Sequence, residues 1–297
     1  MAAARFFAAP VSHKRNESGL GALLMGTAGT LKARLNPLIE RVGAGLFGVD
    51  QYADIFERLA LAHGPAWLWR LLARRRLALE IAAAPLLFIH VPKNGGTSVK
   101  RALYKSDPGH ASLRYYRLFF PSYLARAETF AIIREPTERF LSGYDFLMNG
   151  GGRDVRIQPG LMRRMRHVRT IDDFLDFLEA AHGNWLKVDT FARPQHWYVT
   201  DRAGVVRVRH LWLLEEAGER LPAFLADHGV PGLPHANRTQ REQRALTAGQ
   251  RGRLARLYAE DFLLYAALKA RGGYSDALDG APLSASSLRI TSASTAS

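Results

Sequence analysis

Residues 92–98, PKNGGTS, bring a lysine, two glycines and two hydroxyl side chains into one short stretch. Glycines let the backbone come close to a bound anion, and the free N–H groups and dipole at the start of a helix attract negative charge. Lys93 adds a full positive charge, and Thr97 and Ser98 add hydrogen-bond donors. The stretch therefore predicts a phosphate-binding loop; the alternative is a tight turn with a solvated lysine.

This loop differs from the loop that binds nucleoside triphosphates. That loop has the pattern G-x-x-x-x-G-K-[ST], in which the lysine follows the glycines. Here Lys93 precedes Gly95 and Gly96. We therefore expect a phosphate-binding loop of another class.

A second group of polar residues lies at 134–144, REPTERFLSGY. Arg134 follows a short apolar run, and Ser142 lies about two helical turns beyond it. From the residues alone this pattern is only suggestive. Arg134 could pair with Glu138, and Ser142 could face a neighbouring helix.

Both groups lie where a buried strand is expected to give way to a helix. Residues 86–91, LLFIHV, and 129–133, TFAII, are apolar runs without alternation, as expected of strands buried on both faces. Further helices are predicted at 171–178 and from about 247 to 270, and a further strand at 205–208. The alternation predicts an α/β fold: a single P-loop-like domain with a mostly parallel central sheet flanked by helices.

The patterning divides the chain into three parts. Residues 1–84 are predicted to form a helical N-terminal extension, since the apolar residues around position 55 follow helical spacing. Residues 85–272 form the α/β domain. Residues 273–297 form a disordered C-terminal tail, because serine, alanine and threonine dominate its end.

The composition is globular, with an excess of positive charge. Apolar residues make up 47%, and 41 basic against 27 acidic residues leave a net charge of +14. This excess suggests an anionic partner such as nucleic acid, a lipid surface, a phosphorylated or sulfated small molecule, or an acidic glycan. The absence of cysteine excludes a disulfide scaffold and a thiol nucleophile. No apolar run reaches the roughly 20 residues of a transmembrane helix and no secretory signal is recognised, so a cytoplasmic location is expected, with membrane-surface association left open.

Residues 88–98, FIHVPKNGGTS, resemble the 5′-phosphosulfate loop of carbohydrate sulfotransferases that use 3′-phosphoadenosine 5′-phosphosulfate (PAPS). The resemblance is to the branch that contains heparan sulfate 2-O-sulfotransferase and many bacterial relatives, whose loop usually reads PKTGGTS or PKTASTS. Asn94 departs from the common threonine but keeps a small polar side chain. Residues 134–144 resemble the 3′-phosphate motif of the same family, R-[DE]-P-x-x-R-x-x-S-x-Y. Looser matches extend the resemblance from about residue 85 to 265 and lie at 110–113, 193–195, 233–239 and 258–262.

The resemblance implies a PAPS-dependent sulfotransferase that moves a sulfuryl group to a hydroxyl of a carbohydrate or glycolipid, without a metal ion. Lys93 would be catalytic, because it would neutralise charge on the leaving adenosine 3′,5′-bisphosphate. Arg134 and Ser142 would hold the 3′-phosphate. The 5′ side would be bound by the loop residues Lys93, Asn94, Gly95, Gly96, Thr97 and Ser98.

The reaction needs a general base for the acceptor hydroxyl. His110 is the candidate, because an imidazole titrates near neutrality and this histidine lies in the family-like segment between the two motifs. His196, which follows the Arg-Pro-Gln segment, is the main rival, and His235 is a weaker one. His90 lies inside the first predicted strand and is expected to support the core or the loop.

The sequence leaves two other classes of function open. A nucleotide-dependent phosphotransferase would use the same loop but would need carboxylates for Mg²⁺, and Glu135 is the only acid at the predicted site. A non-catalytic binder of nucleic acid or lipid would explain the charge but neither loop, so no nucleic-acid partner is expected. Residues 150–170 hold six arginines and one acid, which would suit an acidic acceptor; the alternative is a solvated basic loop.

Overall fold

The computed structural model describes residues 45–49, 54–73, 75–104, 109–152, 157, 159–181, 183–230, 232, 244–276, 278, 280 and 282–283. Its centre is a four-stranded sheet in the order β1-β2-β3-β4. The first three strands are parallel and the last is antiparallel to β3. The strands are β1 (Leu86–Phe88), β2 (Glu128–Ile133), β3 (His210–Leu213) and β4 (Tyr274–Ser275). The predicted α/β class with a mostly parallel sheet is confirmed.

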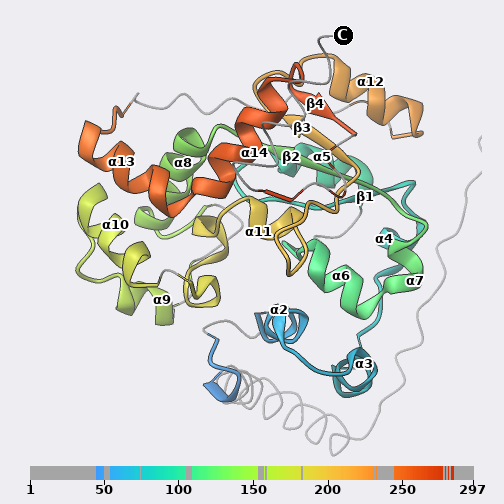
Figure 1. The fold of residues 1–297 in the computed structure, drawn as a ribbon, viewed down its shortest axis with the longest axis horizontal. Coiled ribbons are helices and arrows are strands. Elements are labelled where there is room, and N and C mark those ends of the chain that lie inside the picture. The colour runs from blue at the N-terminus through green and yellow to red at the C-terminus, as the bar shows by residue number, and fades with distance from the viewer. Residues whose placement is uncertain are drawn as a thin grey trace, which may run out of the picture.

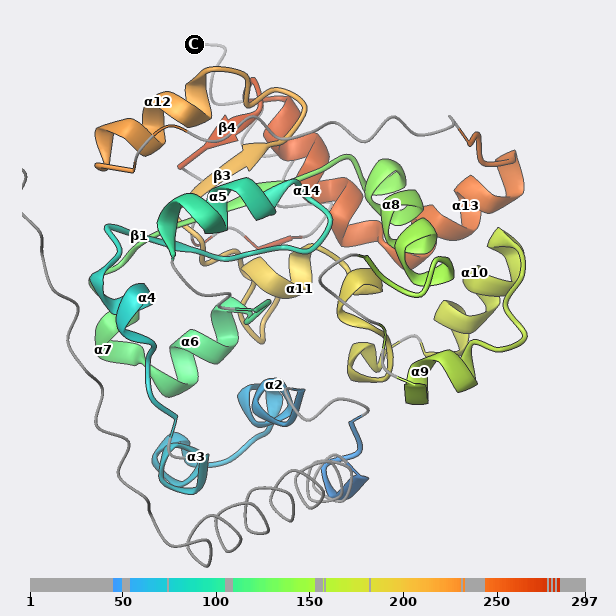
Figure 2. The ribbon, with the colours of Figure 1, turned by 180° about the vertical axis from the view of Figure 1, so that it is seen from behind.

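Helices connect the parallel strands and cover both faces of the sheet. Between β1 and β2 lie α5 (Gly96–Leu103), α6 (Leu113–Phe119) and α7 (Pro121–Leu124). Between β2 and β3 lie α8 (Pro136–Met148), α9 (Pro159–Arg164), α10 (Ile171–Ala180) and α11 (His196–Val199), with 3₁₀ turns at Trp185–Lys187 and Thr190–Ala192. After β3 follow α12 (Arg220–Asp227), α13 (Ala248–Leu257) and α14 (Ala259–Lys269). The helix α14 lies in front of the sheet in Figure 1, and α5 lies in front of it in the reverse view of Figure 2.

The apolar residues form two cores. The larger core surrounds the sheet, whose strand residues Leu86, Leu87 and Phe130 are fully buried. The second core lies between α8, α9, α10 and α13, where Phe140 and Phe174 pack against each other. The helix α8 follows β2 in the chain and also packs in the second core, so both the sheet and this core hold it in place.

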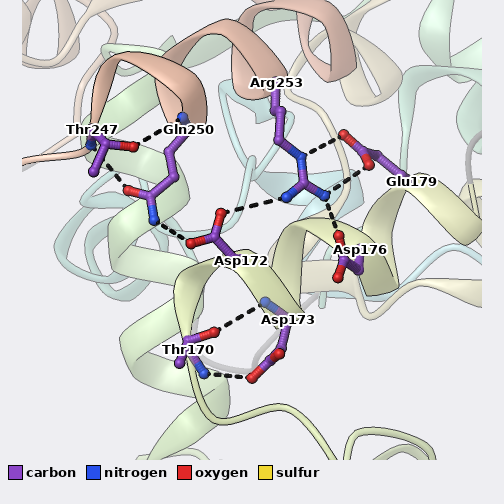
Figure 3. A network of polar contacts seen from close by, with 8 residues as sticks. All are labelled: Thr170, Asp172, Asp173, Asp176, Glu179, Thr247, Gln250 and Arg253. Atoms are coloured by element: carbon purple, nitrogen blue, oxygen red, sulfur yellow. Dashed lines mark hydrogen bonds and ion pairs between the residues drawn. The ribbon is translucent and has the colours of Figure 1, made fainter.

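A polar network on the surface ties α13 to α10 over the second core (Figure 3). The guanidinium of Arg253 bonds Glu179 with its Nε at 2.9 Å, and also contacts Asp172 and Asp176. Gln250 donates from Nε2 to Asp172 at 2.8 Å. A single exposed ion pair contributes little to stability, but Arg253 contacts three carboxylates of α10 and so connects α13 with α10.

The N-terminal helices α2 (Asp54–Leu61), α3 (Ala66–Ala73) and α4 (Leu79–Ala83) lie within the predicted extension. The helix α2 packs on α6, and its Asp54 forms a buried bidentate ion pair with Arg193. Burial alone would lower the pKa of Arg193, but the charge and hydrogen bonds of Asp54 raise it above its usual value. Glu57 on the same helix accepts hydrogen bonds from the N–H and hydroxyl of Ser112 at 2.8 and 2.7 Å. Where it is described, the extension is therefore built into the domain.

We expect Asp54→Asn to lower the free energy of unfolding by about 3–5 kcal/mol, because it leaves the guanidinium of Arg193 buried without its counter-charge. Urea unfolding followed by circular dichroism measures the change. The matched control is Asp227→Asn, an exposed position at the end of α12, where a change within about 0.5 kcal/mol is expected. Equal losses in the two variants would contradict the role of the ion pair.

Four features differ from the sequence-based prediction. The strand predicted at 86–91 is shorter, because β1 ends at Phe88. The strand predicted at 205–208 is wrong: Val205 and Val206 make only isolated bridges, because the Asp201 carboxylate accepts bonds from nearby N–H groups and holds a turn there. The long C-terminal helix is broken at Tyr258, whose side chain is buried and donates to the Ala192 carbonyl at 2.6 Å. The predicted tail begins too early, since Tyr274–Ser275 forms β4; residues 284–297 lie outside the described residues.

Candidate active site

The loop between β1 and α5 carries the predicted phosphate-binding residues and has an unusual backbone. Lys93 has φ 69°, the only positive φ of a non-glycine residue in the described part of the chain, and Gly95 has φ 73°. The backbone N–H groups of Gly95, Gly96 and Thr97 donate to no described residue. Such unbonded N–H groups, at the start of a helix and next to left-handed residues, form an anion-binding concavity. The residues present therefore fit a phosphate group.

Gly96 is required by the packing beneath the loop. A Cβ at this position would lie 2.5 Å from the ring of His90 and 2.8 Å from the ring of Phe88. His90 is buried and stacks on Phe88, with ring centroids 5.3 Å apart. As expected, His90 supports the loop from inside.

The side chain of Asn94 points into the protein. It is 1% exposed, and its Nδ2 donates to the Ile132 carbonyl at 2.6 Å and to Oε1 of Gln195 at 2.7 Å. Only the backbone of Asn94 is therefore placed for the ligand contact that the sequence predicted. The side chain instead fixes the loop to the end of β2.

Gln195 joins the two predicted phosphate sites. Its buried amide accepts from Asn94 and, at 2.9 Å, from the N–H of Arg134, and it donates to the Arg134 carbonyl at 2.8 Å. Its own N–H donates to Asp261 at 2.7 Å. Sequence reasoning gave Gln195 no role, and its only signal was the Arg-Pro-Gln match. The bonds cross more than 60 residues of chain, so local pattern could not reveal them.

Arg134 leaves the end of β2 and reaches the β1–α5 loop. Its Nη1 donates to the carbonyl of Lys93 at 3.3 Å. Its Nη2 lies 3.3 Å from Glu138, so the pairing considered as an alternative does occur. The Glu138 side chain is 57% exposed, and such a pair is weak in water. Arg134 therefore sits beside the loop with a partner that an anion can displace.

Ser142 and Arg139 lie on the helix that follows. Ser142 lies within α8 and is 2% exposed, so its side chain is buried in this structure. Arg139 is equally buried, and its Nε donates to the Pro92 carbonyl at 3.1 Å. Its Nη2 is buried without a hydrogen-bond partner in the described part of the chain. This cation beneath the loop, which sequence analysis did not single out, makes the loop more attractive to an anion.

A row of aromatic rings connects Lys93 with His110. The Nζ of Lys93 lies 4.1 Å from the ring centroid of Phe146. Phe146 packs on Phe191 at 4.4 Å, and Phe191 packs on His110 at 5.6 Å. The two predicted catalytic residues therefore lie on one continuous wall.

The hydrogen bond of His110 fixes its tautomer. Its Nδ1 lies 3.1 Å from the carbonyl oxygen of His90, which only accepts hydrogen bonds. Nδ1 therefore carries the proton in the neutral ring, and Nε2 carries the lone pair. This is the tautomer that a general base requires.

His196 has a comparable arrangement with a carboxylate. Its Nδ1 lies 2.9 Å from Oδ1 of Asp261, and its backbone N–H donates to the same oxygen at 2.8 Å. Asp261 is 2% exposed and also holds Gln195. His196 thus belongs to the support of the two loops, and its Nε2 also carries a lone pair in the neutral ring. His235 lies outside the described residues.

Within the described ranges, no group of three or more histidine, aspartate or glutamate side chains could hold a metal ion. No helix in the same ranges is long and apolar enough to cross a membrane.

Comparison with known proteins gives one result. The sulfotransferase family matches residues 83–266, which include both loops, Gln195 and Asp261. No curated protein matches the chain, and no solved structure matches it. The matched segment covers more than half of the sequence and includes the three parallel strands β1, β2 and β3 and the site at their ends. The chain therefore belongs to the sulfotransferase family.

Proposed function

We propose that this protein is a PAPS-dependent sulfotransferase acting on a hydroxyl group of a carbohydrate or glycolipid, in the branch that includes heparan sulfate 2-O-sulfotransferase. One observation carries the proposal. The β1–α5 loop has unbonded backbone N–H groups, and hydrogen bonds from Asn94 of this loop to Gln195 and from Arg134 to Gln195 connect the loop with Arg134. Two anion sites held in one rigid unit suit a donor with a 5′-phosphosulfate and a 3′-phosphate. A cytoplasmic location remains part of this proposal.

The residues divide the chemistry among them. When bound, PAPS supplies a sulfuryl group whose bond to the 5′-phosphate breaks as the acceptor oxygen attacks. The N–H groups of residues 95–98 bind the 5′-phosphate, and Lys93 neutralises the charge that develops on the leaving oxygen. Nε2 of His110 accepts the proton of the acceptor hydroxyl. Catalysis is then positioning and electrostatics, by analogy with phosphoryl transfer, and needs no metal.

Only some of the arginines that suggested an acidic acceptor lie in the part of the chain that the structure describes. Arg163 and Arg166 are exposed at and beyond the end of α9, while Arg164 donates to the Lys187 carbonyl at 2.6 Å. Arg153 and Arg156 lie outside the described residues. The exposed pair supports an acidic glycan as acceptor, since it would attract one electrostatically.

The test is transfer of radiolabelled sulfate from PAPS, without added metal, to an array of neutral and uronate-containing glycans and glycolipids. Labelled product is expected, and none should form from labelled ATP with Mg²⁺. Phosphate transfer instead would establish the phosphotransferase. That outcome is disfavoured, because the carboxylates near Arg134 already have partners. Glu135 accepts from the Glu138 N–H and from Thr137 and so caps α8, and Glu138 pairs with Arg134. Glu215 accepts from the Glu135 N–H at 3.0 Å.

The double variant Arg134→Ala/Ser142→Ala should narrow the preference for PAPS over its analogue without the 3′-phosphate, by about tenfold or more. The charge-assisted contacts proposed for that phosphate contribute about 1.5–3 kcal/mol each. Competition binding of adenosine 3′,5′-bisphosphate against adenosine 5′-phosphate measures the preference. Arg126→Ala/Ser122→Ala, which removes the same residue types at exposed positions around α7, is the control. An unchanged preference in the first variant would place the 3′-phosphate elsewhere.

Gln195→Met should weaken binding of adenosine 3′,5′-bisphosphate at least tenfold and lower the free energy of unfolding by about 2–4 kcal/mol. The methionine keeps the volume but leaves Asn94 and both backbone groups of Arg134 without their buried partner. Calorimetry at a temperature where the variant is folded separates the two effects. Affinity within twofold of the original would reduce Gln195 to a structural residue.

A further inference from the structure

A second basic site lies away from the phosphate loop, between α3, α6 and the turn that follows Asp201. It is a cavity of about 420 Å³, at the small end of the range for small-molecule sites. Its wall holds four arginines on three separate elements, and one aspartate together with alanine and leucine side chains completes it. The arginines are Arg70, Arg114, Arg117 and Arg202. None of the four belongs to the two loops of the candidate active site or bonds Gln195.

Two of these arginines are held so that most of their donors stay available. Arg70 donates from Nε to the Leu118 carbonyl at 2.6 Å, and Arg202 donates from Nε to the Ala60 carbonyl at 2.8 Å. Each guanidinium has five N–H donors, and neither residue makes another hydrogen bond or ion pair with the described chain. Both guanidinium groups are therefore oriented by the protein and keep their Nη donors for a ligand.

The one carboxylate in the wall, Asp201, does not neutralise Arg70 and Arg202, because its hydrogen bonds go to other groups. Asp201 accepts from Arg117 at 3.2 Å, from Arg207 at 2.9 Å, and from the N–H groups of Ala203 and Val205. Burial would raise the pKa of Asp201, but the hydrogen bonds from Arg207 and the backbone lower it below its usual value. Asp201 is thus ionised and fully engaged, and the wall keeps an excess of positive charge.

Arg114 is the buried member of the group. It is 8% exposed, lies 4.2 Å from the ring centroid of Trp197, and donates from Nη2 to the Trp197 carbonyl. Its Nε is buried and has no hydrogen-bond partner among the residues described. Burial lowers the pKa of Arg114, although the charges of Glu57 and Asp201 oppose the shift. An anion in the cavity would stabilise this cation and relieve the repulsion among the four guanidinium groups.

We propose that this cavity binds a small organic polyanion, of monosaccharide size, that carries at least two phosphate, sulfate or carboxylate groups. Guanidinium forks on different elements bind such groups bidentately, and several groups on one ligand can engage several arginines. The cavity is much larger than a single inorganic anion. The apolar part of the wall suits the carbon skeleton of the ligand.

The test is calorimetric titration of the full chain with fructose 1,6-bisphosphate and with citrate, alongside inorganic phosphate and fructose. At least one of the two polyanions should bind at least tenfold more tightly than phosphate, and fructose should not bind. In Arg70→Gln/Arg202→Gln that affinity should fall at least tenfold. The matched control, Arg126→Gln/Arg256→Gln, removes the same charge from exposed positions after α7 and on α13 and should keep that affinity within twofold.

Several results would overturn the inference. These are failure of both polyanions to bind, binding of phosphate as tightly as either, binding of fructose, and equal losses in the two double variants. Circular dichroism establishes that each variant is folded, which is expected because the four substituted positions are exposed. None of these results depends on sulfotransferase activity, so the two proposals stand or fall separately.

Discussion

Lys93→Ala is expected to reduce turnover by about 10³-fold, which effectively abolishes sulfuryl transfer, while adenosine 3′,5′-bisphosphate binds within about tenfold of its original affinity. The proposed charge of Lys93 acts on the oxygen that becomes negative as the bond breaks, so its loss weakens the transition state more than the bound ground state. The 5′-phosphate would still be held by the N–H groups of the loop, whose left-handed turn at Gly95 is unchanged.

The position of Lys93 makes this substitution informative. Lysine and alanine meet the same steric cost at φ 69°, so the backbone gains or loses little from the exchange. The contact of Nζ with the Phe146 ring is lost, and this contact lies in the row of rings that leads to His110. Steady-state kinetics and calorimetry separate turnover from binding. Lys269→Ala, at an exposed site, should leave both unchanged, and near-normal turnover in Lys93→Ala would remove its assigned role.

The sequence could predict those parts of the site that depend on local pattern. The apolar runs at 86–91 and 129–133 were recognisable as buried strands, and the polar residues after each were recognisable as strand-to-helix loops. Strands that share a parallel sheet present their carboxyl ends at one edge. In the structure β1 and β2 pair in parallel, with Phe88 opposite Phe130, and the two loops therefore leave the same edge of the sheet.

The sequence could not predict contacts made between distant segments. Gln195 lies 101 residues from Asn94, and Asp54 lies 139 residues from Arg193, yet both pairs are buried and hydrogen-bonded. A single glutamine or aspartate on a polar stretch has no periodicity to mark it. The strand error at 205–208 has a similar cause. Valines favour strands, but the turn held by Asp201 shifts the pairing to His210–Leu213.

His110→Ala is expected to lower turnover at least a hundredfold, with binding of adenosine 3′,5′-bisphosphate intact, because it removes the proposed general base. His196→Ala should disturb the loops as well, since His196 and Gln195 share the Asp261 carboxylate. Both histidines place Nδ1 against an oxygen that accepts hydrogen bonds, so in the neutral ring each has its lone pair on Nε2. The contacts at Nδ1 are therefore alike in the two residues. The wall of rings that joins His110 to Lys93 favours His110.

The dependence of turnover on pH distinguishes a base from a supporting residue. The original protein should lose turnover as the base becomes protonated on the acid side, and that acid limb should disappear in His110→Ala but persist in His196→Ala and in Asp261→Asn. His228→Ala is the matched control, because its Nδ1 also contacts a carbonyl, that of Phe224 at 2.7 Å, on the distant helix α12. Disappearance of the limb in His196→Ala instead would transfer the base to His196, with Asp261 as its orienting carboxylate, and would leave the sulfotransferase proposal intact.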